Sequence, residues 1–338
     1  MSGPKILITG ATGYIGGSLL VHLLQSTHSS AKSASFSVLL RSATQAALFE
    51  KLDATPVILE NSDDLDELRR IASGFDIILN FAYSVFPQHA KALVQGLGDR
   101  KKSNSSSREP VFIQASSGTS NISDRPFTAP DRVAKLGLPT EYTDLDPIAV
   151  YEAEKLLNVD EAYAQRTAEL NVIETGLAIG VPTHVVMSPT IYGIGSGPGN
   201  KTSIQVPLLI KSVLKHGYLA VAKEGDAQWD QVHIADLTAL LEILLVRVIE
   251  NQPVPKGKEG IIFSGTTRNS WKDLQLPLRE AMTSWGLDEP SPHPFAELGF
   301  ASNSRTKAEV ARQWGWEPKS ADIEKGLEED WLALTTDV

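Results

Sequence analysis

Short apolar runs alternate with amphipathic stretches through the first 190 residues. Residues 5–9 form a β-branched apolar run that leads into a group of glycines, and leucines then recur at helical spacing at 19, 20, 23 and 24. This pattern predicts a strand, a turn and a helix. The alternation continues, with further strands predicted at 36–40, 55–59, 75–80, 111–115 and 183–187 and helices at 43–52, 63–73, 84–97 and 151–174. Strands that alternate with helices predict an α/β fold with a parallel sheet.

Beyond residue 190 the alternation loosens. A glycine-rich stretch at 193–202 is followed by helices predicted at 205–215 and 237–250 and by a late strand at 260–264. Two earlier segments lack periodicity: 98–109 is polar and predicts a mobile surface loop, and 120–149 carries four prolines and predicts a loop across the mouth of a site. We therefore divide the chain into residues 1–190 and a smaller C-terminal region, 191–338.

The first turn has the composition of a phosphate-binding loop. Gly10 permits a tight turn, Gly13 allows the backbone to approach a pyrophosphate, and Gly16 allows the helix to pack closely on the strand. The N–H groups at the start of the helix then face the anion. The spacing is G-x-x-G-x-x-G, which differs from the common G-x-G-x-x-G fingerprint, so a tight turn of an ordinary α/β protein is the alternative.

Arg41 and Ser42 follow the second predicted strand. In a dinucleotide-binding fold this strand end lies beside the adenosine ribose, where an acidic residue suits NAD and an arginine suits the 2′-phosphate of NADP. No Asp or Glu follows before Glu50. The position therefore predicts NADP, with a solvated surface arginine as the alternative.

Tyr151 and Lys155 are four residues apart on a predicted helix, so both side chains lie on one face. A nearby ammonium favours the phenolate, which brings the pKa of a tyrosine towards the working range of an acid–base group. Ser117 lies just past the fifth predicted strand. Serines at such a place can also satisfy local backbone groups of a turn, which is the alternative.

Composition narrows the partners. The 338 residues are 42% hydrophobic and 21% charged, with a formal net charge of −10. The acidic balance and the absence of a basic run argue against nucleic acid and against an anionic membrane surface. The sequence has no cysteine, and its seven histidines include no pair four residues apart, so no metal is implied. With no secretory signal and no apolar run of 18 residues, we expect a cytoplasmic protein.

These motifs together resemble the extended and atypical short-chain dehydrogenases/reductases, which are epimerase/dehydratase-like. The resemblance rests on the glycine turn with Tyr14-Ile15, on Tyr151 and Lys155, and on Ser188-Pro189-Thr190, which is similar to a segment of dihydroflavonol reductases. It implies a Rossmann-type doubly wound parallel sheet. Residues 1–190 would bind NADP(H) and carry the catalytic residues, and residues 191–338 would mainly bind substrate.

The resemblance also implies roles for individual residues. Ser117 would polarise a substrate oxygen, Tyr151 would transfer the proton, and Lys155 would tune Tyr151 and hold the nicotinamide ribose. Asn61 replaces an aspartate that the family usually carries near the adenine. The implied cofactor contacts are Gly10, Thr12, Gly13, Tyr14, Ile15, Gly16, Arg41, Ser42, Asn61, Phe81, Ala82, Ser116, Tyr151, Lys155, Pro189, Thr190 and Ile191.

The favoured function is an NADPH-dependent carbonyl reductase, or an alcohol dehydrogenase in the reverse direction. No arginine occurs between Arg166 and Arg247, where a nucleotide-sugar enzyme would hold a diphosphate, so we expect a hydrophobic small-molecule substrate. The alternatives are a cofactor-retaining epimerase or dehydratase and a non-catalytic, cofactor-sensing regulator similar to NmrA. A homodimer is compatible with the sequence.

Overall fold

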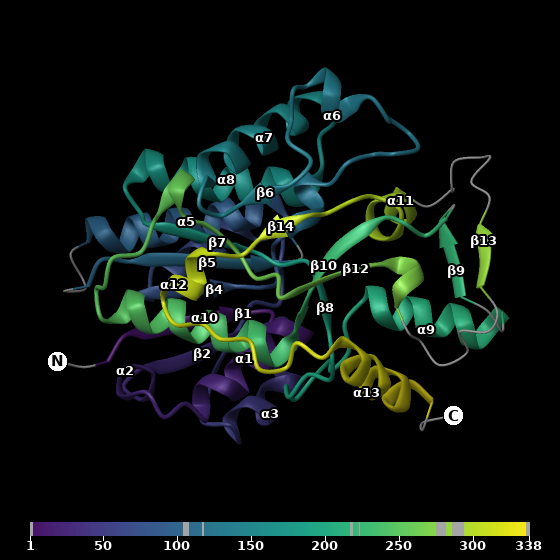
Figure 1. Cartoon of the computed structure of the whole chain (residues 1–338). Coiled ribbons are helices and arrows are strands. Elements are labelled where there is room, and N and C mark those ends of the chain that lie inside the picture. The colour runs from purple at the N-terminus through teal and green to yellow at the C-terminus, as the bar shows by residue number, and fades with distance from the viewer. Residues whose placement is uncertain are drawn as a thin grey trace.

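The computed structural model describes residues 3–103, 108–116, 118–216, 219–222, 224–274, 282–285 and 294–335. At its centre lies a parallel sheet of seven strands in the order β11-β7-β5-β4-β1-β2-β3 (Figure 1). The strands are β1 (Lys5–Thr9), β2 (Ser35–Leu40), β3 (Thr55–Ile58), β4 (Ile77–Asn80), β5 (Val111–Ser116), β7 (Thr183–Met187) and β11 (Ile261–Phe263). The predicted α/β fold with a doubly wound parallel sheet is confirmed.

The apolar runs form this sheet because both of its faces are covered. Ile8 is fully buried and pairs with Val38 on one side and Leu79 on the other. A strand buried on both faces favours a continuous apolar run. The chain builds outward from β1 first through β2 and β3, then through β4, β5 and β7. The reversal between β1 and β4 opens a crevice at the carboxyl ends of these strands, where ligands of doubly wound sheets bind.

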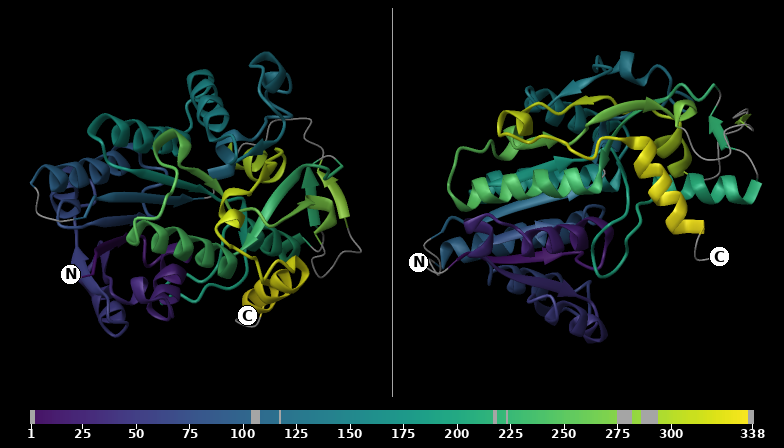
Figure 2. Two further views of the ribbon diagram at one scale, coloured as in Figure 1. Left: turned by 60° about the vertical axis from the view of Figure 1, so that its left-hand side comes forward. Right: turned by 60° about the horizontal axis from the view of Figure 1, so that its bottom comes forward.

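Helices cover the two faces. Helices α8 and α10 lie on opposite sides of the sheet (Figures 1 and 2). Helix α10 packs beside α1 and α2, and α4, α5 and α8 pack in a row. The bounds are α1 (Tyr14–Leu24), α2 (Ser29–Lys32), η1 (Ala43–Gln45), α3 (Ala46–Glu50), α4 (Leu65–Ala72), α5 (Pro87–Lys102), α8 (Ala164–Ile179) and α10 (Ile234–Ile249).

The helix predicted over residues 151–174 is two helices, α7 (Pro147–Asp160) and α8. Asn158 causes much of the break, because its Oδ1 accepts hydrogen bonds from the Tyr163 N–H and from Thr167 Oγ1. Such side-chain bonds offer the backbone an alternative to the helix. Helix α7 begins after Asp146, whose side chain caps it, and α8 ends at Gly180, which has φ +70°.

Two predicted loops are more ordered than expected. Helix α5 continues to Lys102, because Arg100 forms a buried ion pair of 2.6 Å with Asp76, so the prediction of a loop from residue 98 is wrong at its start. Residues 104–107 of that stretch lie outside the described residues. The second segment, 120–149, contains η2 (Gly118–Ile122), α6 (Arg132–Lys135) and β6 (Tyr142–Thr143).

The C-terminal region builds a smaller core beside the carboxyl ends of the main sheet (Figure 2). The three-stranded sheet β12-β10-β8 and helices α9 and α13 surround Trp229, Trp271 and Ile210. Its elements are β8 (Thr190–Tyr192), α9 (Gln205–His216), β9 (Leu219–Ala222), β10 (Gln228–His233), η3 (Gly257–Glu259), β12 (Thr267–Ser270), η4 (Trp271–Asp273), β13 (Met282–Trp285), α11 (Pro294–Phe300), β14 (Thr306–Lys307), α12 (Val310–Gln313) and α13 (Ile323–Thr335).

The main sheet does not end at residue 190. Strand β11 and helix α10 come from the C-terminal part of the sequence, yet they complete the edge and one cover of the seven-stranded sheet. Within the described part of the chain, no helix is both long and apolar enough to cross a membrane.

Candidate dinucleotide-binding site

The glycine turn has the geometry of a phosphate cradle. Gly10 has φ +72°, and a Cβ on it would lie 2.9 Å from the Ala82 nitrogen, so only glycine fits. A Cβ on Gly16 would lie 2.5 Å from the Gly10 carbonyl oxygen. Gly13 is the N-cap of α1 and provides no side-chain cap, which leaves the first N–H groups of the helix available to an anion.

A chain of buried side chains fixes the strand ends around this turn. Thr9 Oγ1 donates to Asn80 Oδ1 at 2.7 Å, and Asn80 Nδ2 donates to Gln114 Oε1 at 2.9 Å. Thr9 Oγ1 also accepts from the Ala82 N–H at 3.2 Å. These bonds link β1, β4 and β5 and hold Phe81 against Gly16.

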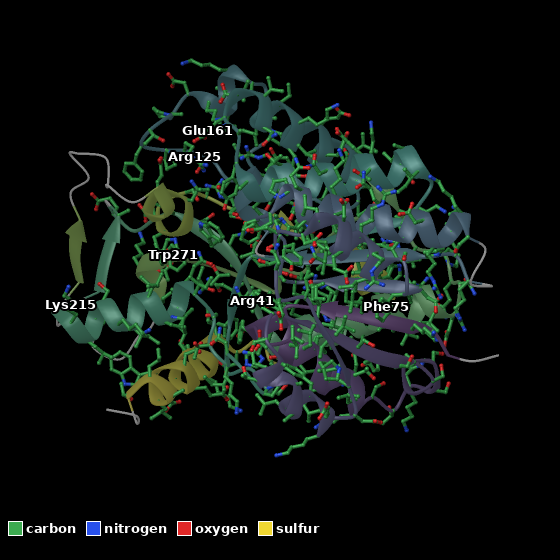
Figure 3. The ribbon with its side chains drawn as sticks, turned by 180° about the vertical axis from the view of Figure 1, so that it is seen from behind. Arg41, Phe75, Arg125, Glu161, Lys215 and Trp271 are labelled. Carbon is green, nitrogen blue, oxygen red and sulfur yellow. The ribbon has the colours of Figure 1, made fainter. Side chains whose placement is uncertain are left out.

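A cavity of about 310 Å³ extends from the glycine turn to the ends of β2 and β3. Tyr83 and His89 form an aromatic wall there, with ring centroids 4.9 Å apart and planes at 18°, and Phe86 packs against both rings. Such flat apolar surfaces suit an adenine ring. Arg41 lies at this cavity, exposed, and no hydrogen bond or ion pair joins it to another described residue. Figure 3 shows Arg41 between the main sheet and the C-terminal region.

Two predicted contacts are not brought to this cavity. Ser42 Oγ accepts from the Thr44 N–H, and Asn61 Oδ1 accepts from the Asp63 N–H, so both side chains serve local turns. Gln45, Ser62 and Asp63 line the cavity instead. The sequence gave little sign of this, because the turn that follows each strand decides which side chain points inward.

A second cavity, of about 210 Å³, continues from the glycine turn toward the C-terminal region. It shares Gly10, Gly13 and Phe81 with the first cavity, so the two form one groove along the start of α1. The other lining residues are Tyr14, Ile15, Gly16, Ile191, Asn200, Thr202, Ser203, Ile204 and Gln205.

The segment between β8 and α9 packs onto the glycine turn. The Asn200 N–H donates to the Thr12 carbonyl at 2.9 Å, and the Tyr14 hydroxyl donates to the Gly193 carbonyl at 2.6 Å. Burial, followed by the charge of Asp330, raises the pKa of Tyr14. Tyr14 therefore remains a neutral hydrogen-bond donor that joins α1 to this segment.

The remaining predicted residues divide between the groove and its surroundings. Ala82 lines the first cavity and Ile191 the second. Thr190 Oγ1 donates to Gln205 Oε1 at 3.1 Å, and Pro189 lies between β7 and β8. Ser116 ends β5, but its side chain and the whole of Ser117 lie outside the described residues.

The structure does not bring Tyr151 to the groove. Its hydroxyl donates to Glu174 Oε1 at 3.0 Å, and Glu174 is ten residues past the start of α8, about 15 Å along the helix axis. Its ring also lies 4.5 Å from the ammonium of Lys258, in η3, which precedes β11 and so lies near the amino end of that strand. The glycine turn is at the opposite, carboxyl end.

The environment of Tyr151 also opposes the predicted role. Burial and the carboxylates of Glu174 and Glu152 raise the pKa of its phenol, although Lys155 is 5.5 Å from the ring. We therefore correct the prediction that Tyr151 and Lys155 face the cofactor. The i,i+4 spacing was read correctly as one face of a helix, but that face packs against α8 and η3.

The helix break brings another tyrosine toward the carboxyl ends of the strands. Helix α8 ends just before β7 begins, so its first residue lies toward the carboxyl end of β7. Tyr163 is the N-cap of α8 and is half-buried, and its hydroxyl donates to Gln165 Oε1 at 3.2 Å. Our sequence analysis missed Tyr163 because it placed it inside a continuous helix. The polar stretch Asn158-Val159-Asp160-Glu161 was the available signal of a break.

A buried charged cluster holds the segment that follows Ser117. Asn121 Nδ2 donates to Glu154 Oε1 at 2.9 Å and to Glu169 Oε2 at 2.7 Å, and Arg166 Nε donates to the Asn121 carbonyl at 2.8 Å. Glu154, Glu169 and Arg166 are each 0% exposed. Burial raises the pKa of Glu154 to about 7, against the opposing effects of its hydrogen bonds to Glu169 and Asn121. At neutral pH the two carboxyls are therefore expected to share a proton.

The geometry defines a Rossmann-type nucleotide-binding fold with a groove at its topological switch point. No protein-family model matches the sequence. The oxidase ucsJ from an Acremonium species is 25% identical over 351 aligned positions, which cover 96% of this chain and 95% of that protein.

Solved structures with the same fold cover nearly the whole chain. Vestitone reductase from alfalfa is 16% identical, with a TM-score of 0.61, over 99% of this chain and 100% of that one. The dTDP-glucose 4,6-dehydratase DesIV from Streptomyces venezuelae, solved with NAD, is 15% identical, with a TM-score of 0.64, over 98% of each chain. UDP-glucose 4-epimerase from Thermotoga maritima is 15% identical, with a TM-score of 0.61, over 98% of this chain and 99% of that one. The predicted resemblance to extended short-chain dehydrogenases/reductases is thus confirmed in the fold.

Proposed function

We propose that the protein is an NADP(H)-dependent oxidoreductase that acts on a hydrophobic small molecule. The observation that carries this proposal is the continuous groove, which has a glycine cradle in its middle and an unpaired arginine at its adenosine end. The close approach of Gly16 to the Gly10 carbonyl leaves room for a pyrophosphate that a larger residue would fill. A nicotinamide cofactor bound there would supply hydride transfer to or from a carbon of the substrate.

The apolar character of the substrate is supported by the far end of the groove. Ile204 lines the second cavity and is 65% exposed, and Leu208, one turn further along α9, is 46% exposed. Exposed aliphatic side chains beside a groove are typical of a site for an apolar ligand. The stretch between Arg166 and Arg247 contains no arginine for a sugar-nucleotide diphosphate.

For the proton that accompanies the hydride, we propose Tyr163 in place of Tyr151. Tyr163 lies at the start of α8, toward the carboxyl end of β7, beside Arg166, whose guanidinium carbon is 5.7 Å from its ring centroid. Ser117 keeps its predicted role as the hydroxyl that polarises the substrate oxygen, because β5 ends at Ser116, in the row of strands that flanks the groove. In the reducing direction Tyr163 would donate its proton to the oxygen as the carbon receives the hydride.

The reaction type is tested by the fate of the reduced cofactor. With NADPH and a panel of hydrophobic ketones, aldehydes and enones, the absorbance band of the reduced nicotinamide should fall in a one-to-one ratio with the product formed. An epimerase or dehydratase regenerates its cofactor within each cycle. Product that accumulates while this band stays constant would therefore contradict a net oxidoreductase.

Cofactor choice is tested at Arg41. If its guanidinium contacts the 2′-phosphate, NADPH should bind about tenfold more tightly than NADH, and Arg41→Gln should remove this preference, because one exposed charge-assisted contact contributes about 1.5 kcal/mol. Titration of nicotinamide fluorescence measures both affinities. Lys51→Gln removes an exposed charge from the same part of the chain and should leave the preference intact. Equal affinities in the unmodified protein would return Arg41 to the status of a surface residue.

A further inference from the structure

We propose a second binding site, for a small apolar carboxylic acid, in a cavity formed by the segment between η2 and β6 and by residues 303–305. The cavity has a volume of about 490 Å³ and shares no lining residue with either part of the dinucleotide groove. This volume is within the usual range of small-molecule sites. Its walls are mainly apolar and include Ile122, Pro126, Pro130, Val133, Leu138 and Pro139.

The walls are anchored to the rest of the protein. Glu297 on α11 accepts hydrogen bonds from the backbone N–H groups of Phe127 and Thr128, at 2.9 and 3.0 Å. On the other side Arg132 is buried and bridges to Asp160 at 2.8 Å and to Glu161 at 2.9 Å. Figure 3 shows Glu161 beside Arg125, which precedes this segment of the wall. Because these contacts and three prolines fix the backbone, a ligand would enter a preformed cavity at a small conformational cost.

Arg305 gives the cavity its chemistry. Its Nη2 donates to Asn303 Oδ1 at 2.9 Å, but its Nε is buried without an acceptor. No carboxylate of the described residues lies within 4.0 Å of its guanidinium. The one carboxylate that lines the cavity, Asp124, already accepts from the Asn303 N–H at 2.7 Å and from Asn303 Nδ2 at 2.8 Å.

A guanidinium with free donors at the edge of an apolar cavity selects an anion with an apolar body. The planar fork of arginine matches a carboxylate, and the charge-assisted hydrogen bonds gain strength where water is excluded. The ligand is therefore a small aliphatic or aromatic carboxylic acid, with its carboxylate on Arg305 and its body against the prolines and Leu138. This site does not depend on the proposed oxidoreductase activity.

Calorimetric titration of the full chain with octanoate and with octan-1-ol tests the assignment. Octanoate should bind at least tenfold more tightly than octan-1-ol, because both fill the apolar cavity but only octanoate pairs with Arg305. Arg305→Gln should lower the affinity for octanoate about tenfold and leave that for octan-1-ol unchanged. Lys135→Gln, an exposed charge on α6 that does not line the cavity, should change neither affinity.

Two further measurements keep the test decisive. Leu138→Glu places a carboxylate in the cavity and should abolish octanoate binding, so the assignment can be judged even if Arg305→Gln does not fold. Saturating NADPH should leave octanoate binding unchanged, because the two cavities are separate. Equal affinities for octanoate and octan-1-ol, or competition between octanoate and NADPH, would overturn the proposal.

Discussion

Replacing Tyr163 with phenylalanine should lower turnover by on the order of 10²–10⁴, the usual loss when a general acid is removed. The expectation follows from the position of Tyr163 at the start of α8, toward the carboxyl end of β7. Cofactor affinity should change little, because Tyr163 does not line the dinucleotide groove. Single-turnover kinetics with NADPH and a substrate found in the carbonyl panel measure the effect.

Tyr151→Phe is the matched control. Its hydroxyl contacts Glu174 and its ring is 2% exposed, so the variant should keep turnover near that of the unmodified protein. It should lose about 1 kcal/mol of stability with the Glu174 hydrogen bond. A variant set in which Tyr151→Phe is inactive and Tyr163→Phe is active would reverse our assignment and restore the pair Tyr151 and Lys155.

Replacing Glu154 with glutamine should stabilise the protein at pH 8 and have little effect at pH 4. The pKa of Glu154 rises from an ordinary 4.5 to about 7 on folding, so between these values the folded state keeps a proton that the unfolded state has lost. Stability therefore falls as pH rises from about 4.5 to about 7, by up to about 3 kcal/mol. Glutamine is neutral at every pH and removes this loss.

Urea unfolding at pH 4, 6 and 8 measures the difference between the variant and the unmodified protein. Because Glu154 and Glu169 titrate as a pair, Glu169→Gln should give a similar pH profile. Glu152→Gln, on the same helix but exposed and 3.6 Å from Lys258, should leave the profile unchanged. Destabilisation of Glu154→Gln at pH 8 would show that the ionised carboxylate, paired with Arg166, stabilises the fold.

The main sheet could be predicted because its signals are local. Residues 5–9 and 183–187 match β1 and β7 at both ends, since a strand buried on both faces needs a continuous apolar run. The glycine turn was equally readable, because a Cβ on Gly10 or Gly16 would meet backbone within 3.0 Å. Arg41 and Phe81 reach the groove for a simple reason: both follow parallel strands, and such strand ends meet at one edge of the sheet.

The errors occurred where a tertiary contact decides the outcome. Helical periodicity continues across Glu161, but Asn158 takes the Tyr163 N–H and divides the helix. The spacing of Tyr151 and Lys155 showed that they share a helix face, and could not show that the face meets Glu174 and Lys258. The cavity at Arg305 was also hidden, because it joins residues 122–142 to residues 303–305, which are far apart in the sequence.

The position of β11 has a consequence for biosynthesis. While the ribosome has released only the first 190 residues, the outer edge of β7 has no partner strand, because Val185 and Val186 pair with residues of β11. The face of α1 that later packs on α10 is also uncovered at that stage. An unpaired apolar strand edge is a site of wrong association between nascent chains. The nucleotide-binding half therefore cannot finish folding behind the ribosome as an independent unit, and it stays exposed to chaperones until β11 has emerged.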